Sequence, residues 1–122
     1  MRIRQAEEFL AQAERALTAT PSPDAAAALA VLSAIATSDA ACCAQLGVRS
    51  RAQDHRQARQ LLATVRPDGE QMARLLDELL SAKDTSHYGT TLIEHGRPER
   101  LVQRASQLLH LARAATKGQA GF

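Results

Sequence analysis

A short polar stretch in the middle of the chain combines residue types that bind and cleave phosphodiesters. It begins at Arg49, and Ser50 and Gln53 have the spacing of a capping box, which is typical of a helix start. A helix start offers unpaired N–H groups to a phosphate, and the guanidinium groups of Arg49 and Arg51 can grip one in a bidentate manner. His55, one turn further on, can transfer a proton near pH 7. The stretch therefore predicts a site that binds RNA or a nucleotide.

The same stretch would support cleavage of RNA without a metal. His55 would assist the attack of a 2′-hydroxyl on the adjacent phosphate, and Arg49 would stabilise the charge of the phosphorane. We expect these two residues to be the catalytic pair if the protein is an enzyme. Arg51 and Asp54 would then contribute to binding.

Asp39 is a carboxylate within an otherwise apolar stripe. Steps of three and four predict an inward face in segment 24–46 that consists of Leu29, Leu32, Ala36, Asp39, Cys43 and Leu46. A carboxylate there must be paired, protonated or facing water. If this segment and the next helix are antiparallel neighbours, Asp39 lies near the level of His55. Two interpretations stay open: an internal pair that fixes helix register, or part of a functional site.

Three further polar residues stand at the mouth of the longest loop, which we expect between Asp84 and Arg97. Lys83, His87 and Tyr88 would either cap the preceding helix or line the edge of a ligand site. Asp84 and His87 have helical spacing, but the Glu-x-x-His pairs of di-iron bundles are absent from the sequence. We therefore expect no metal and no cofactor.

A second Arg and His pair occurs near the end of the chain. Arg104 and His110 are six residues apart, which on a continuous helix places them about 120° from each other. This spacing puts His110 on the solvent face. We do not expect these two side chains to form one site.

Amphipathic periodicity and stop signals predict the elements that position these residues. The expected helices are 2–19, 24–46, 51–65, 70–83 and 98–115, with residues 117–122 as a flexible tail. Ser22 and Pro23 start the second helix, and Gly47 ends it. The prediction is an all-α, up-and-down antiparallel bundle of four to five helices, in a single domain over residues 1–116.

Composition supports this fold class. The chain has 122 residues, and Phe, Tyr and Trp together make up only 2%, so the residues that favour strands are scarce. The net charge of +2 is too mild to indicate a polybasic tail. Arg outnumbers Lys thirteen to two, a bias that GC-rich codon usage produces, as in an actinobacterium.

The sequence also predicts where in the cell the protein is found. We find no signal peptide and expect no membrane-spanning run, so the prediction is a cytoplasmic protein. Cys42 and Cys43 are neighbours in a helical segment and poorly placed to pair with each other. We expect both to be small buried apolar residues.

Over residues 3–115, the chain resembles the small prokaryotic HEPN domains (higher eukaryotes and prokaryotes nucleotide-binding). The resemblance rests on the Ala-rich segment 24–46, on Asp54-His55 with the apolar positions that follow, and on segment 79–83 leading into His87-Tyr88. The last expected helix matches the closing helix of the family. Arg49 and His55, with five residues between them, match the spacing of the family's Arg and His motif, although that motif more often opens the last long helix.

The resemblance implies an up-and-down bundle that forms a homodimer and binds RNA or a nucleotide. Family members with a working motif cleave RNA without a metal at the dimer cleft, in bacterial stress, defence or toxin-antitoxin systems. Many small members lack such a motif and bind nucleotides or proteins instead. The alternative function is therefore a non-catalytic helical module that binds a protein partner and whose Asp, His and Arg cluster is structural.

Overall fold

Helices account for nearly all of the chain that the structure describes. The computed structural model describes residues 2–18, 22–47, 55–86 and 97–120, and within these ranges it contains helices and no strand. The helices are α1 (Arg2–Thr18), α2 (Pro23–Leu46), α3 (His55–Ala63), α4 (Gly69–Ser86) and α6 (Arg97–Ala120). The expected all-α class is confirmed. The last helix is longer than predicted, because residues 117–120 continue its turns where the sequence suggested a tail.

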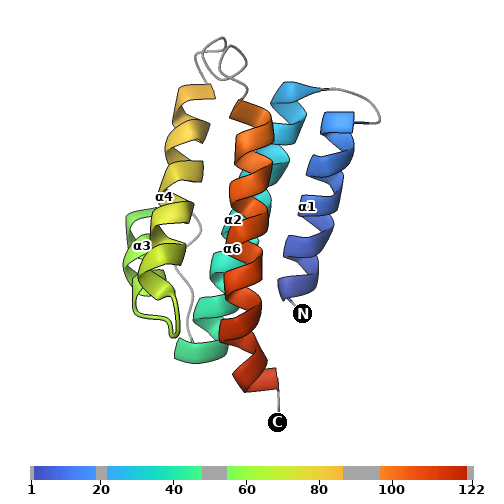
Figure 1. Ribbon diagram of the computed structural model, residues 1–122. Helices are drawn as coiled ribbons and strands as arrows, with labels where there is room; N and C mark the ends of the chain where they lie inside the picture. Colours follow the sequence, from blue (N-terminus) through green and yellow to red (C-terminus); the bar gives the residue numbers. More distant parts are fainter. Residues whose placement is uncertain (1, 19–21, 48–54, 87–96, 121–122) are drawn as a thin grey trace.

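Two parallel helices form the centre of the bundle. Figure 1 shows α2 and α6 packed together, with α1 on one side and α4 with α3 on the other. Gln45 near the end of α2 donates a hydrogen bond to the carbonyl of Ala115 near the end of α6, at 3.2 Å, so the two helices run in the same direction. The flanking helices α1 and α4 run the opposite way (Figure 1). The result is an up-and-down bundle to which α3 is added.

The inward face of α2 is made of small residues. Those that are buried are Ala26, Ala27, Ala30, Val31, Ser33, Ala34, Ala36, Thr37, Ser38, Ala40, Ala41 and Cys42. Short side chains let the backbones of α1 and α6 approach closely, and the hydroxyl of Ser33 donates a 2.8 Å hydrogen bond to the carbonyl of Ala6 on α1. Larger apolar side chains from the other helices, such as Leu62, Leu76 and Leu108, fill the remaining core.

The stripe predicted to face inward on α2 mostly faces outward, so that prediction was wrong. Leu32 and Leu46 are 43% and 37% exposed, Cys43 is exposed, and Leu29 and Asp39 are half-buried; only Ala36 is buried. The helix is apolar nearly all round, so periodicity could not distinguish its faces. The bulky residues define the predicted stripe, but close packing against α1 and α6 buries the side that carries the small ones.

The ends of α2 follow the predicted signals. Pro23 occupies the first turn, and Ser22 precedes it with extended backbone, although its side chain makes no capping hydrogen bond. Gly47 ends the helix in the left-handed conformation, with φ of +71°, and its N–H bonds the carbonyl of Cys43. A residue without a Cβ adopts that conformation at low cost.

Gly69 is needed for a different reason. It is buried at the start of α4, where a Cβ would lie 2.6 Å from the carbonyl oxygen of Leu62 and 2.7 Å from that of Ala63. Only glycine allows the first turn of α4 to approach the end of α3 so closely. Arg59 on α3 and Asp77 on α4 join the same two helices by a 2.8 Å ion pair.

The side chain of Gln45 holds the end of α2 against the turn between α3 and α4. Its Oε1 accepts a 2.8 Å hydrogen bond from the N–H of Arg66, and its Nε2 donates to the carbonyl of the same residue. Since α3 ends just before Arg66, α2 and α3 end at the same level and run in the same direction. The expected antiparallel arrangement of these two helices was therefore wrong.

α2 also has the length and apolar composition of a membrane-spanning helix, although the sequence predicted no membrane-spanning run. Two thirds of its apolar stretch is buried inside the bundle (67%), as in the core helix of a folded domain. Cys42 is buried as expected, but its neighbour Cys43 is exposed.

Candidate functional site

The structure describes only part of the predicted phosphate site. Five of its residues lie outside the described ranges: Arg49, Arg51, Asp54, His87 and Tyr88. His55 is the first residue of α3, and Lys83 lies in the last turn of α4. Asp39 is the one member whose side chain is described, and it is half-buried on the outward side of α2.

The Gln45–Arg66 contact sets the height of Asp39 relative to the start of α3. Asp39 precedes Gln45 by six residues, which corresponds to roughly 9 Å of helix. His55 precedes Arg66 by eleven residues, or roughly 16 Å at the rise of a helix. Because α2 and α3 run in the same direction and touch each other, these two positions lie within about two turns of each other along the bundle. That they belong to one site stays a prediction.

The electrostatic surroundings of Asp39 include the thiol of Cys42. Burial raises the pKa of Cys42 to about 11, a hydrogen bond with Ser38 partly offsets that rise, and the charges of Asp39 and Cys43 add to it. The thiol therefore remains protonated at neutral pH. It is a packing residue and not a nucleophile, because a nucleophilic cysteine needs a lowered pKa.

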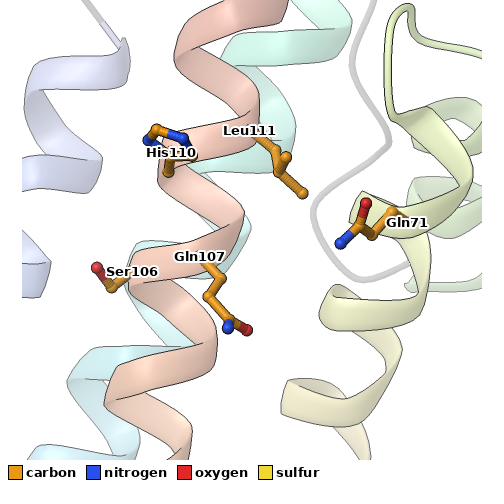
Figure 2. Close-up of a pocket in the computed structure, with 5 residues that line it drawn as sticks. All are labelled: Gln71, Ser106, Gln107, His110 and Leu111. Atoms are coloured by element: carbon orange, nitrogen blue, oxygen red, sulfur yellow. The ribbon is translucent and has the colours of Figure 1, made fainter.

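A separate polar groove lies between α4 and α6. It is an open cavity of about 420 Å³, lined by Gln71, Ser106, Gln107, His110 and Leu111. Figure 2 shows Gln71 on α4 directed toward Gln107 and Leu111 on α6, whereas Ser106 and His110 point to the other side of α6. On the side between α4 and α6, the groove offers the amide groups of Gln71 and Gln107.

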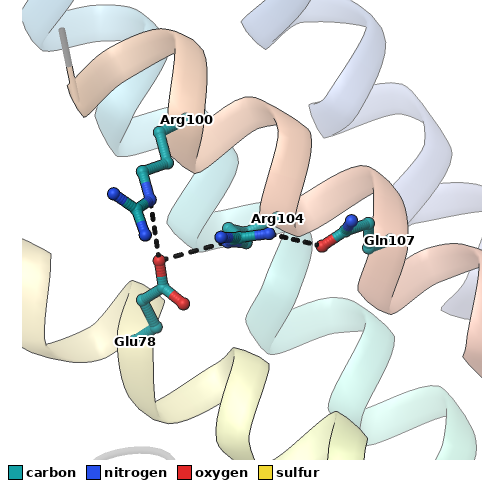
Figure 3. Close-up of polar contacts among 4 residues, drawn as sticks. All are labelled: Glu78, Arg100, Arg104 and Gln107. Carbon is teal, nitrogen blue, oxygen red and sulfur yellow. Dashed lines mark hydrogen bonds and ion pairs between the residues drawn. The ribbon is translucent and has the colours of Figure 1, made fainter.

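A cluster of three charged residues adjoins this groove. The carboxylate of Glu78 on α4 contacts Nε of Arg100 at 3.4 Å and Nε of Arg104 at 3.2 Å, both from α6 (Figure 3). Arg104 also donates from Nη1 to Gln107 at 3.1 Å, which links the cluster to the groove. One carboxylate faces two guanidinium groups, so the cluster has a net positive charge. Its side chains are 26–58% exposed, so salt screens them.

The sequence reading missed this cluster, although a signal was present. Arg100, Arg104 and Gln107 recur at steps of four and three, which places them on one face of α6. The other predicted relation on this helix holds: His110 is exposed, and Arg104 is held by Glu78 and Gln107 rather than by His110.

The described part of the chain contains no group of three or more His, Cys, Asp or Glu side chains that could hold a metal ion.

No family model matches the sequence, and neither a curated protein nor a solved structure matches it significantly.

Proposed function

We propose that the chain is a HEPN-like helical bundle that binds RNA or a nucleotide beside the start of α3. The observation that supports this proposal is that Asp39 on α2 and His55, the first residue of α3, lie within about two turns of each other along the bundle. Arg49 and Arg51 precede His55 in the sequence by six and four residues. A phosphate at this level would meet two guanidinium groups and a helix start.

The chemistry we propose for this site is cleavage of RNA by its own 2′-hydroxyl. The imidazole of His55 would accept the 2′-hydroxyl proton, and the oxygen would attack phosphorus. The bond to the 5′-oxygen would break, leaving a 2′,3′-cyclic phosphate, and the 5′-oxygen would become a hydroxyl by taking the proton that His55 had accepted. Arg49 would neutralise the additional negative charge of the phosphorane. These steps need no metal, and Arg51 and Asp54 would position the strand.

Three other residues would complete the binding surface. Lys83 lies in the last turn of α4, and His87 and Tyr88 come directly after the helix in the sequence. The side chains of Lys83 and Tyr88 would contact phosphate or sugar oxygens. Such contacts would explain why this stretch is polar, since a bundle without a ligand does not need polar side chains there. Replacing Lys83 by Ala should weaken RNA binding.

The test is a cleavage and binding assay on a fluorescent oligoribonucleotide in the presence of EDTA. His55→Ala should abolish cleavage and leave the thermal unfolding transition in place, and Arg49→Ala should reduce both binding and cleavage. His110→Ala is the matched control, because it removes an exposed histidine from α6. Equal cleavage by the His55→Ala and His110→Ala proteins would refute the catalytic proposal. Absence of binding to RNA and to nucleotides would refute the whole function.

A second candidate function is a non-catalytic helical module that binds a protein, and the apolar outward side of α2 favours it. In this case, the Asp, His and Arg cluster would only fix the positions of the helices. Asp39→Ala and His55→Ala would then lower the melting temperature, and no phosphate compound would raise it. Because α2 is mostly buried in the bundle, we infer for both functions a cytoplasmic protein that does not span a membrane.

A further inference from the structure

The groove between α4 and α6 and the charged cluster around Glu78 form one continuous surface. Four residues of α6 lie along it at steps of four, three and four, and so share one face of the helix: Arg100, Arg104, Gln107 and Leu111. Arg104 joins the cluster to the groove, because its Nη1 donates a 3.1 Å hydrogen bond to Gln107. From Arg100 to Leu111, this surface is roughly 16 Å long.

Positive charge exceeds negative charge on this surface. The carboxylate of Glu78 is in contact with the guanidinium groups of Arg100 and Arg104, at 3.4 and 3.2 Å. Arg74 adds a positive charge on the α4 side, since it is exposed and lies three residues after Gln71 and four before Glu78. Three guanidinium groups therefore share the surface with one carboxylate. Such a surface is complementary to a ligand with negative charge.

Glu78 shows which kind of negative group the cluster accepts. Its oxygen Oε2 contacts Nε of both arginines, so the two guanidinium groups converge on a carboxylate (Figure 3). A guanidinium has five N–H donors, and the contacts described here use one of Arg100 and two of Arg104. The cluster can therefore bind a second carboxylate while Glu78 stays in place, although repulsion from Glu78 weakens that binding.

The rest of the groove suits a polypeptide better than a nucleic acid. The amide groups of Gln71 and Gln107 donate and accept hydrogen bonds, as a peptide group does, and Leu111 adds an apolar contact. Single-stranded nucleic acids bind to aromatic side chains along a track of cations, but the residues described as lining the groove include no Phe, Tyr, Trp, Arg or Lys. We propose that the groove binds an acidic segment of a partner protein, with its carboxylates at Arg100 and Arg104 and an apolar side chain at Leu111.

The dimensions of the surface predict a short segment and a weak, reversible contact. An extended chain advances about 3.3 Å per residue, so about five residues span this surface. The side chains of the cluster are 26–58% exposed, so salt screens each ion pair and its contribution is small. We expect a dissociation constant of about 10 µM to 1 mM that rises with salt. The interaction does not depend on the RNA site proposed beside α3, because the two surfaces share no residue.

Fluorescence polarisation with a short labelled peptide tests the proposal. The probe has a central run of glutamates and a leucine at each end, and the same peptide with glutamines in place of the glutamates is the control probe. The wild-type protein should bind the acidic probe more tightly than the glutamine probe. Arg100→Gln and Arg104→Gln should each weaken binding by about two- to tenfold, whereas Glu78→Gln, which removes the competing carboxylate, should strengthen it by a similar factor.

Arg4→Gln is the matched control, because it removes the same charge from an exposed position of α1, on the other side of the bundle from α4 (Figure 1). Its affinity for the probe should equal that of the wild type. Equal losses in Arg4→Gln and Arg104→Gln, weaker binding by Glu78→Gln, or no binding by the wild type would overturn the proposal. An oligoribonucleotide that displaces the probe and itself binds less tightly to Arg104→Gln would assign the groove to nucleic acid instead.

Nuclear magnetic resonance determines where the peptide binds. On titration with the acidic probe, the backbone amide signals of residues 71–78 and 100–111 should shift, and those of α1 should stay in place. Shifts confined to α1, α2 or α3 would contradict the proposal even if the affinities followed the expected order.

Discussion

Replacing Gly69 by Ala should destabilise the protein through a steric clash at the turn between α3 and α4. The new methyl group would lie 2.6 and 2.7 Å from two carbonyl oxygens of α3, about 0.7 Å closer than an ordinary contact. These oxygens belong to the helix backbone, so α4 as a whole must move. Overpacking of this kind costs about 1–3 kcal/mol, and the better helix propensity of Ala returns at most about 1 kcal/mol. We expect a net loss of about 1–2 kcal/mol.

The assay is thermal unfolding followed by circular dichroism. For a chain of this size, the loss corresponds to a melting temperature lowered by about 4–10 °C. Gly47 provides the control, because a Cβ there meets nothing within 4 Å and the cost of Gly47→Ala comes only from its φ of +71°. Gly47→Asn should therefore recover stability, since Asn tolerates that conformation, whereas Gly69→Asn should not. A Gly69→Ala protein that melts at or above the wild-type temperature would refute the steric argument.

Three further predictions concern the side chains of Gln45, Glu78 and Cys42. Gln45→Ala removes the hydrogen bonds that join α2 to the turn and to α6, so urea unfolding should show a loss of about 1–3 kcal/mol. Glu78→Gln should change stability by less than about 1 kcal/mol, because its ion pairs are partly exposed, and melting curves at low and high salt should differ less than those of the wild type. The raised pKa of Cys42, about 11 against 9.0, stabilises the fold below pH 9, and that contribution should be lost as pH rises toward 11. Cys42→Ala should remove this component from the pH dependence of melting.

Local signals in the sequence were sufficient to predict where most helices begin and end. Ser22, Pro23 and Gly47 bound α2 as expected, because each acts within one turn of the chain. In the segment 70–83, Met72, Leu76 and Leu79 have amphipathic spacing in the sequence, and all three are buried. These features depend on neighbouring residues alone.

Features that depend on contacts between distant segments could not be predicted. The orientation of α2 about its own axis is decided by which side allows α1 and α6 to come close, and a helix that is apolar all round does not reveal it. The direction of α3 relative to α2 is shown by the contact between Gln45 and Arg66, which are 21 residues apart. Nothing in the local pattern around either residue indicates that contact.

The candidate site stays a prediction, because most of its residues lie outside the described ranges. The structure describes Asp39 and the start of α3, and it shows α2 and α3 parallel where an antiparallel arrangement was expected. The cluster around Glu78 was overlooked because its residues come from two helices, and a single periodic pattern displays only one of them.

The parallel packing of α2 on α6 has a consequence for the order of folding. α1 and α2 are joined by a short connection and can pair early, as can α3 and α4. By contrast, 50 residues separate the end of α2 from the start of α6, and the whole α3–α4 pair lies within that interval. Closing so long a loop costs entropy before any contact is gained. We therefore expect α6 to dock on α2 after the α1–α2 and α3–α4 pairs have formed, and until then the part of the small-residue face of α2 that α6 covers is open to solvent.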